Sequence, residues 1–212
     1  MELNQYLVLA SFAAVLIGMS KGGLPLVGML SVPVLSLVMS PVKAAVLLLP
    51  LFVISDAVGV WLYRKNYSLV NLKILVPAGV AGVLIGWATA AMISELTIKF
   101  LIGLVGVSFC LQTWFKRGQS ELAQPASLPK GIFWGGVAGF TSFIAHAGGP
   151  PFQIFVLPQK LAKAEFAGTA TILFAIINLS KIAPYQNLSP YTEEDFWKVL
   201  VLVPFALLGT FL

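Results

Sequence analysis

Charged residues are scarce in this chain. They make up 10% of its 212 residues, whereas hydrophobic residues make up 58%; a soluble domain carries about 25% charged residues. A soluble protein of this length needs a polar surface around its core. Because most of the surface here must be apolar as well, the composition excludes an ordinary soluble domain. It predicts an all-α polytopic membrane protein whose main partner is the lipid bilayer.

Cysteine and histidine are also scarce, with one of each. The single Cys110 excludes an internal disulfide framework, and its apolar surroundings indicate a small buried hydrophobic residue. The single histidine has no Cys, Asp or Glu at ligand spacing, so no metal site is expected. A phosphate-binding Walker loop, a Gly-x-Ser-x-Gly elbow and a His-Glu-x-x-His motif are all missing. We therefore expect no enzymatic activity, no ATP-driven transport by this chain alone and no cofactor.

The basic residues are present but scattered. Thirteen Lys and Arg residues against eight acidic ones give a formal charge of +5, and they stand singly or in pairs between apolar runs. This pattern is typical of residues that set membrane topology, so no nucleic-acid partner is expected. The N-terminus lacks a basic region before its first apolar stretch, which continues past Lys21, so we expect that segment to be retained.

Long apolar runs dominate the rest of the chain. A membrane-spanning helix needs about 20 apolar residues. Runs of this kind cover residues 3–39, 43–63, 74–94, 98–115, 131–157, 163–184 and 196–212, and we expect a polar acidic loop at 186–195. We predict a first membrane repeat at 1–117, a cytoplasmic linker at 118–130 and a second membrane repeat at 131–212. Because the last run is still apolar at Leu212, we expect the natural protein to continue into a further helix.

The two halves resemble each other weakly. Each opens with a run broken by glycine and proline, at residues 21–25 (KGGLP) and 146–151 (HAGGPP), and each has a later Lys-Ala pair, Lys43-Ala44 and Lys163-Ala164. Broken segments at matching places in two pseudo-symmetric repeats indicate a transporter with its binding site at the breaks. If the broken runs are re-entrant hairpins, the repeats are inverted, which fits the basic residues slightly better. If each broken run crosses once, the repeats are parallel, and both topologies stay open.

The breaks themselves suggest an anion site. Their glycines are Gly22, Gly23, Gly148 and Gly149. Glycine leaves backbone amides uncovered, and the prolines that follow suit the first turn of a restarting helix. The N-terminus of a helix attracts anions, so two facing breaks would form a small anion pocket. The alternative is that these glycines only allow close helix packing.

Four charged or titratable residues lie in or beside apolar runs. Lys21 either adds a cation to the anion pocket or extends to the lipid headgroups. His146 could bind substrate, relay a proton or simply bond to a carbonyl. Asp56, deep in its run, could bind a coupling cation, titrate, or pair with Lys21 or Lys181 in a structural ion pair.

Uncharged polar residues complete the candidate site. Asn178 lies close to Lys181 in the second half, at a place that corresponds to Asp56 in the first. Thr141, Ser142 and Gln153 border the second break and could donate hydrogen bonds to an oxyanion.

Several of these runs resemble the TauE/SafE family of membrane permeases, also called the toluenesulfonate uptake permease family. The resemblance rests on residues 18–25 (GMSKGGLP) with Gly28, residues 139–151 (GFTSFIAHAGGPP), and residues 166–169 (FAGT) leading to 178–185 (NLSKIAPY). It implies a bacterial inner-membrane secondary carrier of about eight spans in two repeats. Its cargo would be sulfite, thiosulfate, sulfonates or related small sulfur anions. The family's last helix is missing here, which leaves transport by this chain and its oligomeric state, a homodimer included, open.

Three functions therefore remain to be weighed. The leading hypothesis is a secondary transporter of small sulfur anions, with protons as a candidate coupling ion and the pocket at the two breaks. A passive anion channel and a non-transporting membrane subunit are the alternatives. A membrane-embedded enzyme is least expected, because the sequence offers no nucleophile–base pair.

Overall fold

The fold is built from helices. The computed structural model describes residues 3–22, 26–90 and 122–211, together with isolated positions between 92 and 114. Every regular element in these parts is a helix, and no strand occurs among them. The prediction of an all-α protein is confirmed for the described residues, whereas the two repeats remain a prediction.

The elements follow one another in two groups. The first contains α1 (Leu3–Gly22), η1 (Val27–Leu30), α2 (Ser31–Leu35), α3 (Pro41–Tyr63) and α4 (Leu69–Ala90). The second contains α6 (Leu128–Ala145), α7 (Gly149–Val156), η2 (Leu157–Gln159), α8 (Lys163–Ser180), α9 (Ile182–Leu188) and α10 (Glu193–Thr210).

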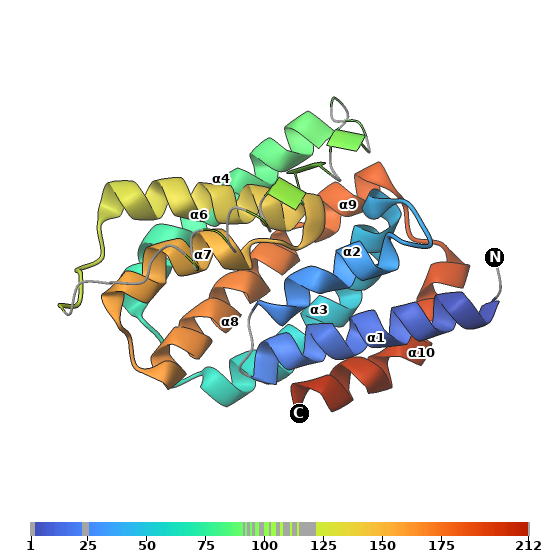
Figure 1. Ribbon diagram of the computed structural model, residues 1–212, viewed down its shortest axis with the longest axis horizontal. Helices are drawn as coiled ribbons and strands as arrows, with labels where there is room; N and C mark the ends of the chain where they lie inside the picture. Colours follow the sequence, from blue (N-terminus) through green and yellow to red (C-terminus); the bar gives the residue numbers. More distant parts are fainter. Residues whose placement is uncertain are drawn as a thin grey trace.

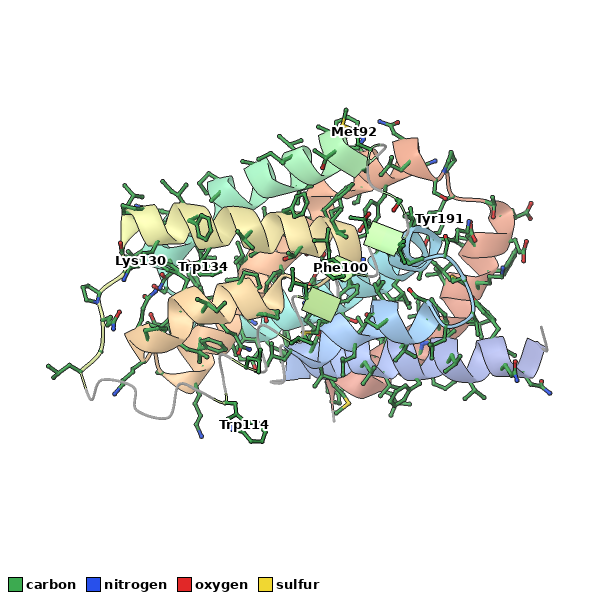
Figure 2. All side chains as sticks on the ribbon, turned by 45° about the horizontal axis from the view of Figure 1, so that its top comes forward. Met92, Phe100, Trp114, Lys130, Trp134 and Tyr191 are labelled. Atoms are coloured by element: carbon green, nitrogen blue, oxygen red, sulfur yellow. The ribbon has the colours of Figure 1, made fainter. Side chains whose placement is uncertain are left out.

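Two described helices are long and apolar enough to cross a membrane. They are α3 and α4. The helices α8 and α9, which meet at an angle of 41°, make a third candidate if the two together count as one broken span. Large apolar side chains also cover the outside of the molecule. Met92 is 86% exposed and Trp114 is 73% exposed, at opposite edges of the view in Figure 2. Such a surface fits lipid and not water.

The helices pack in three pairs (Figure 1). Helices α4 and α6 form one side, α1 and α10 form the other, and α3 and α8 lie between them. Helix α3 contacts α1 and α10, while α8 contacts α4, so the middle pair joins the two outer pairs. The short helices α2 and α7 pack beside this stack, α2 against α1 and α3 and α7 against α6 and α8.

Glycine allows both outer pairs to approach closely. A Cβ at Gly139 of α6 would lie 1.9 Å from the carbonyl oxygen of Gly79 on α4. In the other pair, a Cβ at Gly18 of α1 would lie 2.0 Å from the carbonyl oxygen of Ala206 on α10. Small residues at such crossings let helix backbones pack directly in a membrane.

The broken runs break where the sequence predicts. Helix α1 ends at Gly22, α6 ends at Ala145, and α7 restarts at Gly149. Gly23 and Cys110 lie outside the described residues.

One expected loop is much shorter than predicted. The sequence suggested a polar loop over residues 186–195, but α9 continues to Leu188 and α10 begins at Glu193. A capping box explains the early start of α10: the Thr192 hydroxyl accepts from the backbone N–H of Asp195, and the Asp195 carboxylate accepts from the backbone N–H of Thr192. The acidic residues there therefore cap a helix instead of forming a loop.

Candidate functional site

The first part of the site is a buried ion pair between α1 and α3. The Nζ of Lys21 lies 2.7 Å from Oδ1 of Asp56, and the side chains are 6% and 4% exposed. Lys21 is therefore covered by protein and paired, and does not extend to the headgroups. A charge this far from water requires such a partner, since desolvation costs several kcal/mol per ion.

Asn178 links this pair to a second lysine. Its amide Nδ2 donates to Oδ2 of Asp56 at 2.7 Å, and its Oδ1 accepts from Nζ of Lys181 at 2.8 Å. Asn178 and Lys181 are three residues apart, at the end of α8 and just beyond it, so one turn of helix brings both into the site.

Lys181 is the most enclosed charged residue described, with 0% of its surface exposed. Besides Asn178, its Nζ contacts the Ser142 carbonyl oxygen and Nδ1 of His146, each at 2.9 Å. None of these three partners is a carboxylate. Lys181 lies at the 41° bend between α8 and α9.

His146 closes the chain of contacts at the second break. Its backbone is left-handed, with φ at 53°, and it ends α6 by donating its N–H to the Ser142 carbonyl at 2.9 Å. Left-handed backbone is uncommon for a residue other than glycine and marks a position held by its surroundings. Here the holding contacts come from the ring, whose Nε2 lies 3.0 Å from the Ala45 carbonyl oxygen and which stacks on Phe52 at 4.3 Å between centroids.

Two aromatic side chains, which we did not predict, face Lys21. Its Nζ lies 5.7 Å from the ring centroid of Phe52 and 5.9 Å from that of Phe174. Each phenylalanine is four residues before a predicted site residue, Asp56 or Asn178, and therefore on the same face of its helix. This spacing is the sequence signal that could have identified them.

A small cavity of about 30 Å³ lies at the meeting point of these residues. Five of the predicted site residues line it: Lys21, Ser142, His146, Gly149 and Asn178. The rest of its wall comes from Ser20, Gly28, Met29, Phe52 and Phe174. The cavity therefore joins the end of α1, the second break and the middle helices α3 and α8.

The second break offers the cavity few backbone donors. Helix α7 begins at Gly149 after Gly148, and the next two residues, Pro150 and Pro151, have no N–H. Gly148 is required for close packing, because a Cβ there would lie 2.6 Å from Phe174 and 2.7 Å from the Ala138 carbonyl oxygen. Only the described end of the first break, Gly22, can be placed, so two facing helix N-termini stay a prediction.

Two predicted donors lie elsewhere. The Thr141 hydroxyl donates to the Val137 carbonyl of its own helix at 2.8 Å, and Gln153 is buried on α7 but does not line the cavity. Thr141 and Ser142 are neighbours on a helix and so point about 100° apart, which explains why only Ser142 reaches the cavity.

The charges of the site do not balance. Among the described residues that form it, two lysines meet one carboxylate, because Lys21 pairs with Asp56 and Lys181 contacts only uncharged groups and the ring of His146. With the ring neutral and both lysines protonated, the cluster carries a net charge of +1 in surroundings of low dielectric. An anion in the adjoining cavity would balance this charge.

Comparison with known protein families identifies the family of the chain. The family model described as Sulfite exporter TauE/SafE matches residues 7–212. No curated protein and no solved structure matches the chain. The match covers nearly the whole sequence and includes both breaks and both buried lysines. The chain therefore belongs to the TauE/SafE sulfite exporter family of membrane transporters.

Proposed function

We propose that this chain is a multi-pass secondary carrier of the bacterial cytoplasmic membrane that moves small sulfur anions such as sulfite, thiosulfate or simple sulfonates. The observation that supports it is the excess of basic over acidic side chains in the buried cluster, where Lys21 and Lys181 are accompanied by a single carboxylate, Asp56. Buried charge without compensation is costly, and binding an anion removes the cost. Family membership supports the same class of cargo.

Each residue has a distinct role in this proposal. Lys21 lines the cavity and is the cation closest to the cargo. The rings of Phe52 and Phe174 face its ammonium group and exclude water from it. Lys181 acts through its charge, since its three N–H directions already have acceptors. Asp56 and Asn178 hold the two lysine side chains at fixed positions, so that their ammonium groups stay in the site when the anion leaves.

The size of the cavity implies that it changes during transport. About 30 Å³ is close to the volume of one water molecule, whereas a sulfur oxyanion has at least four heavy atoms. The anion must therefore enter a wider conformation. The end of α1 at Lys21 and the second break at His146 and Gly149 line the cavity, and the bend at Lys181 follows Asn178, which also lines it. These interruptions are the places where helices can move as separate pieces.

Flux into proteoliposomes tests the proposal. Labelled sulfite, thiosulfate and methanesulfonate would be offered to vesicles with the wild-type chain, Lys21→Met, Lys181→Met, and Lys198→Met as the matched control. Lys198 is a partly exposed lysine paired with Glu194, outside the site. We expect saturable uptake of at least one anion by the wild type and the control, and a loss of at least tenfold in both site variants.

Other outcomes would redirect or overturn the proposal. Uptake that rises linearly without saturation, with conductance of single-channel size, would identify a passive channel. No uptake of any anion by folded protein would overturn the carrier and favour a non-transporting subunit. Equal uptake by the wild type and both site variants would overturn the site while leaving the carrier.

A further inference from the structure

The contact between Lys181 and His146 joins two nitrogens that can each lose or gain a proton. Their separation is 2.9 Å, and both side chains are buried, at 0% and 7% exposure. A hydrogen bond of this length needs one hydrogen between the two nitrogens. The surrounding contacts decide how many protons the pair holds.

The ring nitrogen on the far side of His146 must carry a hydrogen. Nε2 lies 3.0 Å from the Ala45 carbonyl oxygen, which can only accept. If the ring is neutral, Nδ1 therefore has a free lone pair that faces Lys181.

Two hydrogens of Lys181 are committed in the same way. The Ser142 carbonyl oxygen accepts one. Oδ1 of Asn178 accepts the other, and this amide cannot be reversed because its Nδ2 donates to the carboxylate of Asp56. The third position on Nζ points at Nδ1 of His146 and holds either a hydrogen or a lone pair.

One proton satisfies this contact, and neither zero nor two does. With one, either Lys181 donates to a neutral ring or an imidazolium donates to a neutral amine. With none, two lone pairs face each other, and with two, two N–H groups do. We propose that Lys181 and His146 form a single proton-binding site, the coupling site of the carrier, that shares one transferable proton and binds it together with the anion.

The remaining charged groups around the pair explain why anion and proton bind together. Lys21 on α1 and Asp56 on α3 face it and cancel each other, and Tyr185 on α9 lies edge-on to the ring with its hydroxyl donating to the Phe143 carbonyl. The cluster is therefore at +1 with the shared proton and neutral without it. An anion favours the protonated form, and by linkage the proton favours anion binding. The linkage between proton and anion binding rests on the proposed function.

The position of the pair lets the proton control the breaks. His146 ends α6 in a left-handed conformation, and Lys181 lies at the bend between α8 and α9. Loss of the proton replaces a hydrogen bond by repulsion between lone pairs, so it separates the two interruptions. The protonated form thus keeps Lys181 and His146 in contact, and the deprotonated, empty form lets them separate.

A spectroscopic test needs no cargo. Because His146 is the only histidine, protein labelled with [¹⁵N]histidine in lipid vesicles gives the signals of one imidazole. In the wild type we expect protonated Nε2 and a hydrogen-bonded Nδ1, and a single change at Nδ1 as the pH rises. In Lys181→Met, Nδ1 should show a free lone pair, whereas Lys198→Met should match the wild type. Identical Nδ1 signals in the wild type and Lys181→Met, or a bare Nε2, would overturn the shared proton.

Lys181→Arg provides a second test that remains valid if Lys181→Met does not fold. Guanidinium keeps the positive charge and a donor but does not release a proton in this range. The pH-dependent change at Nδ1 should therefore disappear while the signal stays hydrogen-bonded. Persistence of the wild-type pH dependence in this variant would contradict a proton shared with Lys181.

A transport test addresses the coupling. Methanesulfonate remains ionised and has no neutral form that could carry protons across lipid by itself. With a pH indicator inside the vesicles, uptake should acidify the interior by about one proton per anion, as linkage at a single site requires. Uptake without acidification, or with alkalinisation, would overturn the coupling while leaving the carrier. No uptake of any sulfur anion would instead count against the proposed function, and the labelled histidine would still report on the shared proton.

Discussion

The two buried lysines have nearly the same local structure and different polar partners. Lys21 and Lys181 each follow a serine whose hydroxyl donates to the carbonyl of the isoleucine three residues earlier, at 2.6 Å and 2.7 Å. Each lysine also lies where a helix is interrupted. Yet Lys21 meets the carboxylate of Asp56, while Lys181 meets a carbonyl, an amide and an imidazole.

This difference separates two tasks that a buried cation can perform. A paired ammonium holds helices together, because removing its partner strands a charge in the interior. An ammonium among neutral acceptors costs stability but keeps its charge available to an anion or a labile proton. The helix break supplies the lysine in both cases, and the partner on another helix decides what the lysine does.

The largest expected effect comes from removing each lysine in turn. Lys21→Met leaves the Asp56 carboxylate buried with only the Asn178 amide, so we expect a loss of about 3–5 kcal/mol. Lys181→Met leaves the Asn178 oxygen and Nδ1 of His146 without their donor but also removes an unpaired charge, so we expect a loss of about 1 kcal/mol. Reversible unfolding in mixed micelles measures both, and equal losses would erase the distinction between the two lysines.

A double variant sharpens the same comparison. Adding Asp56→Asn to Lys21→Met removes the stranded carboxylate, so we expect the double variant to recover about 2–3 kcal/mol of the single variant's loss. Adding Asp56→Asn to Lys181→Met should give no recovery, because Lys21 then becomes the stranded charge. The free energies of unfolding of the wild type, the three single variants (Asp56→Asn included) and the two double variants give both coupling terms. Recovery of the free energy of unfolding in both Lys21→Met and Lys181→Met would mean that Asp56 interacts equally with the two lysines.

Two glycines, one in the second break and one on α3 beside Lys21, give a smaller effect. A Cβ at Gly148 would lie 2.7 Å from the Ala138 carbonyl oxygen, which belongs to a helix backbone and cannot move alone. A Cβ at Gly59, close to Lys21, would instead meet the Thr171 methyl group at 2.7 Å. We expect Gly148→Ala to cost about 2–3 kcal/mol and Gly59→Ala about 1 kcal/mol. Thermal unfolding compares the losses of stability of the two variants. A larger loss for Gly59→Ala would show that the second break accommodates a methyl group more easily than the contact between α3 and α8 does.

The helices and their breaks were predictable because they depend on local composition. Apolar runs of the right length predicted α3 and α4, and glycine with proline predicted the ends of α1 and α6. The early start of α10 was missed because acidic residues suggest a loop as readily as a helix cap. Its capping box depends on one threonine at the right spacing, Thr192.

The pairing within the site was not predictable to the same degree. Polar residues in apolar runs are rare, which made it possible to choose the main site residues from the sequence: Lys21, Asp56, His146, Asn178 and Lys181. Whether Asp56 meets Lys21 or Lys181 depends on how four helices cross, and one sequence left both open. Glycine-allowed contacts between distant helices, such as Gly139 with Gly79, fix those crossings and leave no local signal.

A partly exposed ion pair gives the smallest effect and tests what burial adds. Nζ of Lys43 lies 2.6 Å from Oδ2 of Asp195, in the polar first turn of α10 before its apolar run, but Lys43 is 35% exposed. Burial raises the pKa of the Asp195 carboxyl, and the hydrogen bonds from Lys43 and Thr192 outweigh it and hold the pKa below its ordinary value. The pair's stabilisation is therefore present at neutral pH and is lost as the pH falls through this lowered pKa.

Lys43→Gln should accordingly cost less than about 1 kcal/mol at neutral pH, against the 3–5 kcal/mol expected for Lys21→Met. It should also move the acid loss of stability to higher pH, because the carboxyl loses its cation and its pKa rises. Free energies of unfolding from about pH 7 to about pH 3 compare the variant with the wild type. A cost equal to that of Lys21→Met would mean that the geometry of the ion pair, and not the depth of Lys21 and Asp56, sets its strength. The small cost expected for Lys43 therefore isolates the contribution of the low-dielectric interior, on which the positive charge at Lys181 also depends.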